Sequence, residues 1–426
     1  MTFLFLLSSL CAAPLTLDHT EHILSSGMRL IVHEDHRAPL FAAELRYHVG
    51  AADDSVPGLA HLVEHLMFEG SASAPEAAYD RWLAEAGASN NAWTSHDTTA
   101  FTVVGPANAL ELTLFLESDR MGWMLLDEED LINQLAVVFS ERALSRSAVG
   151  GLITPSTSAA LFPPGHPYRT TVLGDPDPLA EVSLAQIQAF VDRWYQPANA
   201  TLVVGGAVSA QEVIALAEKH FSDVPVSPRP LREARPPTGL DREVRRVLYD
   251  EVNPTLLAVW PTVPRLHPDE PALDLLADVL TSRLAEGRLS AVSWTANRQL
   301  AGRLSVRLTH PRWRLRRTLR ALEREIRRLK RAPVAVAELA RLQRKWRVSY
   351  ARRSEGLEER VAMLAACAVE DGPPDCIESI LQAREAVTPA DIQSAAQAYL
   401  GAERLLLSSV PWRQRRLALP ASEEAP

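Results

Sequence analysis

The chain has 426 residues, of which 47% are hydrophobic and 23% are charged, which is the composition of a globular protein and not of a disordered or fibrous one. This length exceeds what one ordinary hydrophobic core supports, so two or more domains are expected. The formal net charge of −9 argues against a nucleic-acid-binding protein, and no apolar run is long enough to span a bilayer.

Residues 1–13 have the features of a signal peptide, because a short apolar stretch ends in small residues, although the usual basic start is missing. We therefore expect an exported protein, in the bacterial periplasm or secreted. A disordered leader or a misassigned start codon is the alternative. Cleavage after Cys11 would leave Cys367 and Cys376, nine positions apart around a proline-containing turn. Such a pair favours a disulfide in an oxidising compartment, whereas two free thiols would fit a reducing cytosol.

Strand-like apolar runs at residues 28–32 and 45–49 precede the most informative segment of the chain, residues 58–68, which read GLAHLVEHLMF. His61 and His65 are four residues apart, so on a helix both rings lie on one face, and Glu64 lies beside them. The apolar residues between them would bury the other side of this helix against a core.

This spacing is typical of a zinc peptidase. A catalytic zinc site has three protein ligands and an open position for water, so a third ligand has to come from elsewhere in the chain. Glu64 is better placed as a general base than as a ligand, because it could take a proton from zinc-bound water and pass it to the leaving amine. The order H-x-x-E-H is the inverted form of the commoner H-E-x-x-H motif.

Residues 90–104 alternate in polarity and predict one strand. Residues 224–240 are rich in proline and polar side chains, which predicts an extended linker. Similar segments start at Val182 and Val387, 205 positions apart. Each predicts a helix capped by Ser183 or Thr388 and followed by a strand, at 200–204 and at 405–408.

The repeat predicts two homologous α/β units in tandem, an α+β fold with mixed, largely antiparallel sheets packed with helices. The first unit spans residues 14–223 and the second spans residues 241–426, with strands expected at 244–249 and 255–260. Only the first unit carries the metal motif. Residues 312–331 predict a helix with a basic face and a buried stripe formed by Leu315, Leu319, Leu322, Ile326 and Leu329.

Taken together, these segments resemble the pitrilysin/insulinase family of zinc peptidases, in particular its half-length members such as the mitochondrial processing peptidase and bacterial exported homologues. The resemblance covers about residues 20–222 and is softer in the second half. Besides the metal motif, it rests on segments that read LSSGMRLIV from Leu24, YHVG from Tyr47, NAWTS from Asn91, VVFSER from Val137, LESDRM from Leu116 and YQPANA from Tyr195.

The resemblance implies Zn²⁺ as the metal and Glu141, 76 positions after His65, as the third ligand. Gln134 stands where the family usually has a second Glu. It is either a neutral hydrogen-bonding substitute near the ligands or a mark of weakened catalysis. The family's counterpart of residues 90–104 is an edge strand beside the zinc, which implies that Asn91 and Ala92 bind the main chain of a peptide substrate.

Family members build a closed chamber from four such domains, so this chain would form half of a clamshell and pair with a second family subunit. Partner subunits often carry an Arg and a Tyr several residues apart, and residues 293–300 read SWTANRQL without that pair. This favours a heterodimer over a homodimer. The expected function is a zinc metalloendopeptidase acting on peptides or unfolded polypeptide segments. The alternatives are a non-catalytic structural subunit of the family and a metal-dependent hydrolase of other substrates.

Overall fold

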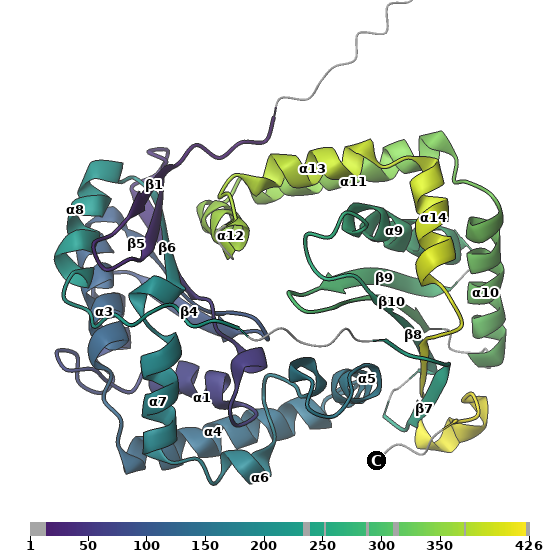
Figure 1. The fold of residues 1–426 in the computed structure, drawn as a ribbon, viewed down its shortest axis with the longest axis horizontal. Helices are drawn as coiled ribbons and strands as arrows, with labels where there is room; N and C mark the ends of the chain where they lie inside the picture. Colours follow the sequence, from purple (N-terminus) through teal and green to yellow (C-terminus); the bar gives the residue numbers. More distant parts are fainter. Residues whose placement is uncertain are drawn as a thin grey trace, which may run out of the picture.

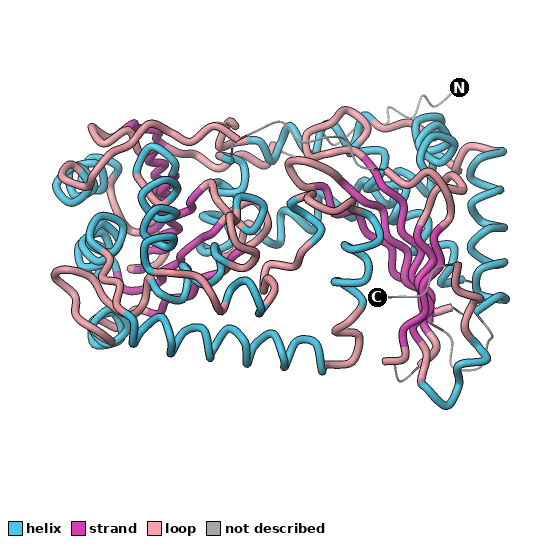
Figure 2. Tube along the Cα trace, turned by 60° about the horizontal axis from the view of Figure 1, so that its bottom comes forward, coloured by secondary structure: helices cyan, strands magenta, loops and turns pink. Residues whose placement is uncertain are grey.

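The chain folds into two similar units that face each other across the middle of the molecule (Figure 1). A computed structural model describes residues 14–232, 239–250, 253–286, 289–309, 315–369 and 372–422. The expected signal peptide, residues 1–13, and part of the expected linker, residues 233–238, lie outside these ranges. In Figure 2 the strands form two groups, one in each half of the molecule.

The sheet of the first unit has the strand order β1-β2-β6-β3-β5-β4. Only β2 and β6 pair in parallel, and every other neighbouring pair is antiparallel. The strands are β1 (Thr20–Ile23), β2 (Arg29–Glu34), β3 (Leu40–Tyr47), β4 (Ser89–Thr94), β5 (Thr99–Pro106) and β6 (Ala200–Gly206).

The sheet of the second unit repeats this arrangement in the order β7-β11-β8-β10-β9, again with one parallel pair, β7 and β11. Its strands are β7 (Val244–Leu248), β8 (Thr255–Thr262), β9 (Ser290–Asn297), β10 (Gly302–Thr309) and β11 (Leu405–Ser409). Strand β2 thus corresponds to β7, β6 to β11, β3 to β8, β5 to β10 and β4 to β9. This confirms the predicted fold class of two related, largely antiparallel α/β units.

The helices of the two units occur in the same order relative to the strands. Those of the first unit are α1 (Leu59–Leu66), α2 (Ala78–Glu85), α3 (Leu110–Trp123), α4 (Glu128–Ser147), α5 (Ile153–Leu161), α6 (Pro176–Leu179), α7 (Leu184–Trp194) and α8 (Ala210–Phe221). Those of the second are α9 (Glu270–Glu286), α10 (Leu315–Arg331), α11 (Val336–Arg353), α12 (Leu357–Cys367), α13 (Cys376–Ala386) and α14 (Pro389–Tyr399). Both predicted capping boxes are present, at the start of α7 and of α14.

The prediction of one strand over residues 90–104 was wrong, because this segment is a hairpin of β4 and β5. Ser95 forces the turn, since its hydroxyl accepts hydrogen bonds from the backbone N–H groups of Asp97 and Thr98 at 3.2 and 3.0 Å. A polar side chain that satisfies two backbone donors competes with continued strand pairing. The hairpin makes β4 the edge of the first sheet, as the resemblance implied.

One helix of each unit packs on the sheet of the other unit. Helix α12 of the second unit packs on β3 and β6 of the first sheet, where Leu364 and Val361 join a buried cluster with Ile31 and Val203. Helix α5 of the first unit packs on β11 of the second sheet, where Leu161 joins a second buried cluster. Helices α5 and α12 hold equivalent places in the order of elements, so the exchange is reciprocal.

Two smaller predictions are also confirmed. Cys367 and Cys376 form a disulfide that joins the end of α12 to the start of α13. The five apolar side chains of the predicted stripe on α10 are buried. In the part of the chain that the structure describes, no helix combines the length and apolar character needed to cross a membrane.

The exchanged helix α12 generates a stability prediction. Leu364 is fully buried on the first sheet, so Leu364→Ala removes packing and leaves a cavity, and we expect the free energy of unfolding to fall by about 2–5 kcal/mol in urea denaturation. Val348→Ala on α11 is the control, because that side chain is 56% exposed and its loss should change stability by less than about 0.5 kcal/mol. Equal stability of the two variants would contradict the packing role of α12.

Candidate metal centre

Helix α1 is positioned by its first turn. The Asp54 carboxylate accepts hydrogen bonds from the backbone N–H groups of Gly58 and Ala60 at 2.7 and 2.8 Å, so it satisfies donors that have no partner within the helix. Gly58 has φ of +101°, and a Cβ there would lie 3.1 Å from the Cα of Gly174. The absence of side chains at these two glycines lets the loop before α6 lie directly against the start of α1.

The two imidazoles of α1 meet a carboxylate from α4. The Nε2 atoms of His61 and His65 each lie 3.6 Å from Oε2 of Glu141. Ligands of a tetrahedral zinc ion with bonds near 2.05 Å are roughly 3.4 Å apart, so the separations fit such an ion. Among the described residues, these three form the one group of His, Cys, Asp or Glu side chains close enough together to hold a metal. Helix α9, which follows β8 as α1 follows β3, carries no His.

The protonation states suit metal binding. Burial, with a further contribution from His65, lowers the pKa of His61 to about 4, so its ring is neutral near pH 7 and has a lone pair to donate. Glu64 is buried on the same helix, and the Thr94 hydroxyl at the end of β4 donates a hydrogen bond to its Oε2. Burial raises the pKa of Glu64, and the Thr94 hydrogen bond opposes this change. A carboxylate in this position can exchange a proton with a group at the metal site.

Gln134 and Glu69 fix the orientation of His65. The Gln134 amide donates from Nε2 to Oε1 of Glu69, which turns its Oε1 toward His65 Nδ1 at 3.1 Å. Because an amide oxygen can only accept, His65 Nδ1 carries the proton and its Nε2 presents a lone pair toward Glu141. Gln134 is thus a hydrogen-bonding neighbour of a candidate ligand.

Strand β4 brings the candidate substrate-binding residues to the same place. The Thr102 hydroxyl on β5 donates to the carbonyl oxygen of Asn91 at 3.2 Å, so the Ala92 N–H of the same peptide points away from β5, toward the free edge. That N–H donates to Oδ1 of Asn91 at 2.9 Å. A backbone group bonded only to an exposed side chain is open to exchange with an incoming peptide.

The structure brings His61, Glu64, His65, Glu141 and Gln134 together and places Asn91 and Ala92 on the adjoining edge strand. Sequence reasoning missed the contacts of Thr94 and Glu69. Glu69 follows His65 by four residues, a spacing that could have suggested a shared helix face. Thr94 carried no comparable signal, because its contact with Glu64 depends on the position of the hairpin.

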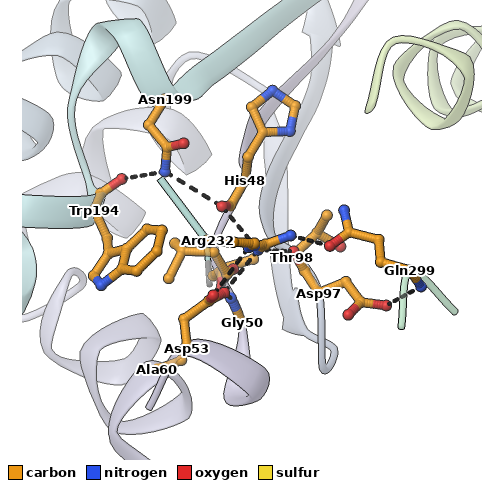
Figure 3. Close-up of polar contacts among 12 residues, drawn as sticks. His48, Gly50, Asp53, Ala60, Asp97, Thr98, Trp194, Asn199, Arg232 and Gln299 are labelled. Carbon is orange, nitrogen blue, oxygen red and sulfur yellow. Dashed lines mark hydrogen bonds and ion pairs between the residues drawn. The ribbon is translucent and has the colours of Figure 1, made fainter. Parts of the chain in front are cut away.

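A polar strap links the start of α1 to the second unit (Figure 3). The Arg232 guanidinium donates to both carboxylate oxygens of Asp53 at 2.9 and 2.7 Å and to the backbone oxygen atoms of His48 and Asp97 at 3.0 Å each. It also donates to the side chain of Gln299, in the turn between β9 and β10. Burial raises the pKa of Asp53, and the Arg232 charge opposes this change.

Two family models match the chain. "Insulinase (Peptidase family M16)" matches residues 29–155 and "Peptidase M16 inactive domain" matches residues 181–345. A zinc protease, PqqE, of Helicobacter pylori is 28% identical over 275 residues, which are 62% of this chain and 61% of that protein. The chain spans less than two thirds of the curated relatives that it matches.

Solved structures share the fold. A protease from Helicobacter pylori has a TM-score of 0.85 at 21% identity and covers 92% of this chain and 100% of its own. The periplasmic protease PqqL from Escherichia coli has a TM-score of 0.82 at 17% identity, and the match covers 96% of this chain but 49% of that chain. The fold of the present chain thus corresponds to the whole of the first of these chains and to about half of the second.

The Gln134 contact generates a metal-affinity prediction. Gln134→Ala removes the acceptor that holds His65, and we expect Zn²⁺ affinity, measured by competition with a chromophoric chelator, to fall by roughly 10- to 100-fold. Ile132→Ala on the same helix is the matched control, because that side chain is 65% exposed. Equal affinities of the two variants would show that the hydrogen bond does not support the site.

Proposed function

Because the chain belongs to the insulinase family of peptidases, family M16, we propose that it is a zinc metalloendopeptidase that hydrolyses peptides or unfolded polypeptide segments. We assign the catalytic unit to residues 14–223 and the second unit to residues 241–426, whose described part holds no candidate metal site. The observation that carries this proposal is the convergence of two imidazoles and one carboxylate beside a buried, hydrogen-bonded Glu64.

We assign His61, His65 and Glu141 as the ligands of Zn²⁺. When bound, zinc supplies a Lewis acid that polarises the scissile carbonyl and lowers the pKa of the attacking water. The 3.6 Å separations of the ligand atoms and the neutral state of His61 support this assignment. Gln134 and Glu69 hold the His65 ring with its Nε2 lone pair directed at the site.

Glu64 serves as the general base and then as the general acid. Its carboxylate accepts a proton as water attacks the peptide carbonyl, and it delivers that proton to the leaving amine. The Thr94 hydroxyl holds Oε2, which leaves the other carboxylate oxygen for the proton. Because Thr94 ends the edge strand, a substrate strand paired with β4 passes directly beside this carboxylate.

The substrate binds as an added strand on β4. Its backbone carbonyl replaces Asn91 Oδ1 as the acceptor for the Ala92 N–H. Main-chain pairing of this kind recognises an extended backbone and not a particular sequence, so it suits unfolded segments.

The chain works with a second family subunit, and a heterodimer is favoured over a homodimer. Support comes from the match to about half of the longer PqqL chain, because a second subunit would take the place of the other half. We also propose that the protein is exported to the periplasm or secreted. The Cys367–Cys376 disulfide and the periplasmic description of PqqL support this localisation.

The alternative function is a non-catalytic structural subunit, which would keep the fold without turnover. Gln134 in place of a carboxylate favours this alternative, whereas the complete set of candidate ligands beside Glu64 favours catalysis. Activity of the chain with its native partners decides between the two.

Replacement of the proposed base tests the mechanism. Glu64→Gln keeps the shape and the Thr94 contact but cannot accept a proton, so we expect peptide turnover to fall by about 10²- to 10⁴-fold with Zn²⁺ content retained. Turnover is measured with quenched fluorescent peptides on the chain co-purified with its partners, and Glu111→Gln, at an exposed site, is the control. Unchanged turnover would remove Glu64 from the mechanism, and an inactive, metal-loaded parent protein would favour the structural subunit.

A proline substitution tests the edge strand. Ala92→Pro removes the N–H proposed to bind the substrate backbone and should lower kcat/KM by roughly 10-fold, about the value of one hydrogen bond. Ala92→Val keeps the N–H at the same position and should stay within about 3-fold of the parent protein. Similar losses in both variants would point to a steric effect at this position and against backbone pairing.

A further inference from the structure

A cavity of about 370 Å³ lies directly beside the candidate metal centre. Ser95 and His96 form one wall, immediately after Thr94, whose hydroxyl contacts Glu64. Arg142 and Arg146 form another wall, on the turn of α4 that follows Glu141. A peptide strand that runs along β4 past Thr94 therefore reaches this cavity next.

The cavity is lined by cations and lacks an acidic side chain. Arg142, Arg146 and Arg298 line it, and none of its lining residues is Asp or Glu. Arg142 uses Nε to donate to the carbonyl oxygen of Gly174 at 3.1 Å, and Arg298 lies over the ring of Tyr168 at 5.2 Å. Across the described ranges, neither Arg146 nor Arg298 forms an ion pair within 4.0 Å.

Two carboxylates lie near the pocket without lining it, so its three arginines leave an excess of positive charge. The Asp97 carboxylate stabilises the charged form of Arg298, and it accepts hydrogen bonds from two neutral groups, the Tyr168 hydroxyl at 2.5 Å and the Gln299 N–H at 3.4 Å. The Asp250 carboxylate accepts a hydrogen bond from the backbone N–H of Gly150 at 3.0 Å. Arg303 lines an adjoining cavity that shares Gly150 and Thr154 with this one. The His96 ring is neutral near pH 7 and adds no positive charge, because burial lowers its pKa to about 3. Its Nε2 lies 2.9 Å from the Thr170 carbonyl oxygen.

We infer that this cationic pocket binds a carboxylate of the peptide substrate and so selects acidic substrates. The inference rests on the proposed peptidase function and adds a substrate class to it. Guanidinium groups that form no ion pair in the described part of the chain, as in Arg146 and Arg298, gain from a carboxylate, which accepts charge-assisted hydrogen bonds from them in a fork. The carboxylate comes either from an Asp or Glu side chain beyond the cleaved bond or from the C-terminus of a short peptide.

Binding to an inactivated protein tests the pocket without requiring turnover. Zinc-loaded Glu64→Gln protein is titrated with fluorescent peptides that differ only by Glu or Gln at one position, scanned along a neutral peptide. The same peptides are made with a free C-terminal carboxylate or with a C-terminal amide. We expect one Glu position, or the free C-terminus, to strengthen binding by about 10-fold, and the arm that responds identifies the source of the carboxylate.

Pocket variants are compared in the same assay. In Arg146→Gln/Arg298→Gln the preference for the acidic peptide should fall to within 2-fold, and Arg146→Gln alone, at an exposed position, should lower it partly. Arg316→Gln, on the exposed face of α10, is the matched control and should keep the preference. The proposal that the pocket binds a carboxylate is contradicted if the double variant keeps the preference. It is also contradicted if the Glu64→Gln protein with an intact pocket shows no preference.

The two proposals fail in different ways. Selective binding of acidic peptides without hydrolysis by the parent protein would support the carboxylate-binding pocket and contradict the peptidase function. Hydrolysis with equal kcat/KM for Glu and Gln peptides, and also for peptides with a free or an amidated C-terminus, would support the peptidase function and contradict the pocket.

Discussion

The reciprocal packing of α5 and α12 is the constraint on which the rest of the structure depends. Helix α4 carries Gln134 and Glu141 and leads through a short turn into α5, which is buried on the sheet of the second unit. The histidines, by contrast, belong to α1 and rest on the first sheet. The distance between the histidines and Glu141 is therefore set by two anchors in different units. Helix α12 makes the reciprocal contact, because it packs the second unit against the first sheet.

The geometry of the candidate metal centre therefore depends on contacts in both units. The Arg232 strap acts in the same direction, because it holds Asp53, just before α1, and Gln299 of the second unit with one side chain. A buried cluster at α12 adds a further tie, in which Arg360 donates to His33 Nε2 at 3.0 Å. The first unit thus contacts the second at two separate places, where α12 packs on β3 and β6 and where Arg232 joins Asp53 to Gln299.

Sequence patterns predicted what is local. The i, i+4 histidines, the capping boxes at Ser183 and Thr388 and the apolar stripe of α10 all follow from the period of a helix, so residues within one element suffice to find them. The resemblance to a family supplied Glu141 and Gln134, which no local rule connects to α1.

The remaining features escaped prediction because they depend on distant partners. The turn at Ser95 is decided by two backbone hydrogen bonds that compete with an alternating, strand-like pattern. Thr94 meets Glu64 only after that turn has set the register of β4 against β5. The exchange of α5 and α12 leaves no signal in either helix, since a buried apolar face looks the same whichever sheet covers it. Composition likewise reports an acidic chain and hides the arginines gathered around one cavity.

The neutral amide at position 134 has a simple electrostatic consequence. A glutamate there would place a negative charge one hydrogen bond from His65, whereas in this chain the group bonded to His65 is neutral and a carboxylate, Glu69, is bonded to that amide. The relay from His65 through Gln134 to Glu69 keeps the imidazole in the tautomer that metal binding needs, because the direction of the amide is fixed by the carboxylate behind it. Burial raises the pKa of Glu69, and the nearby charges of Asp130 and Glu76 raise it further, so a cation at the site and this carboxylate would stabilise each other. An amide at position 134 therefore holds the His65 ring without adding a charge of its own, and Glu69 is the carboxylate behind it.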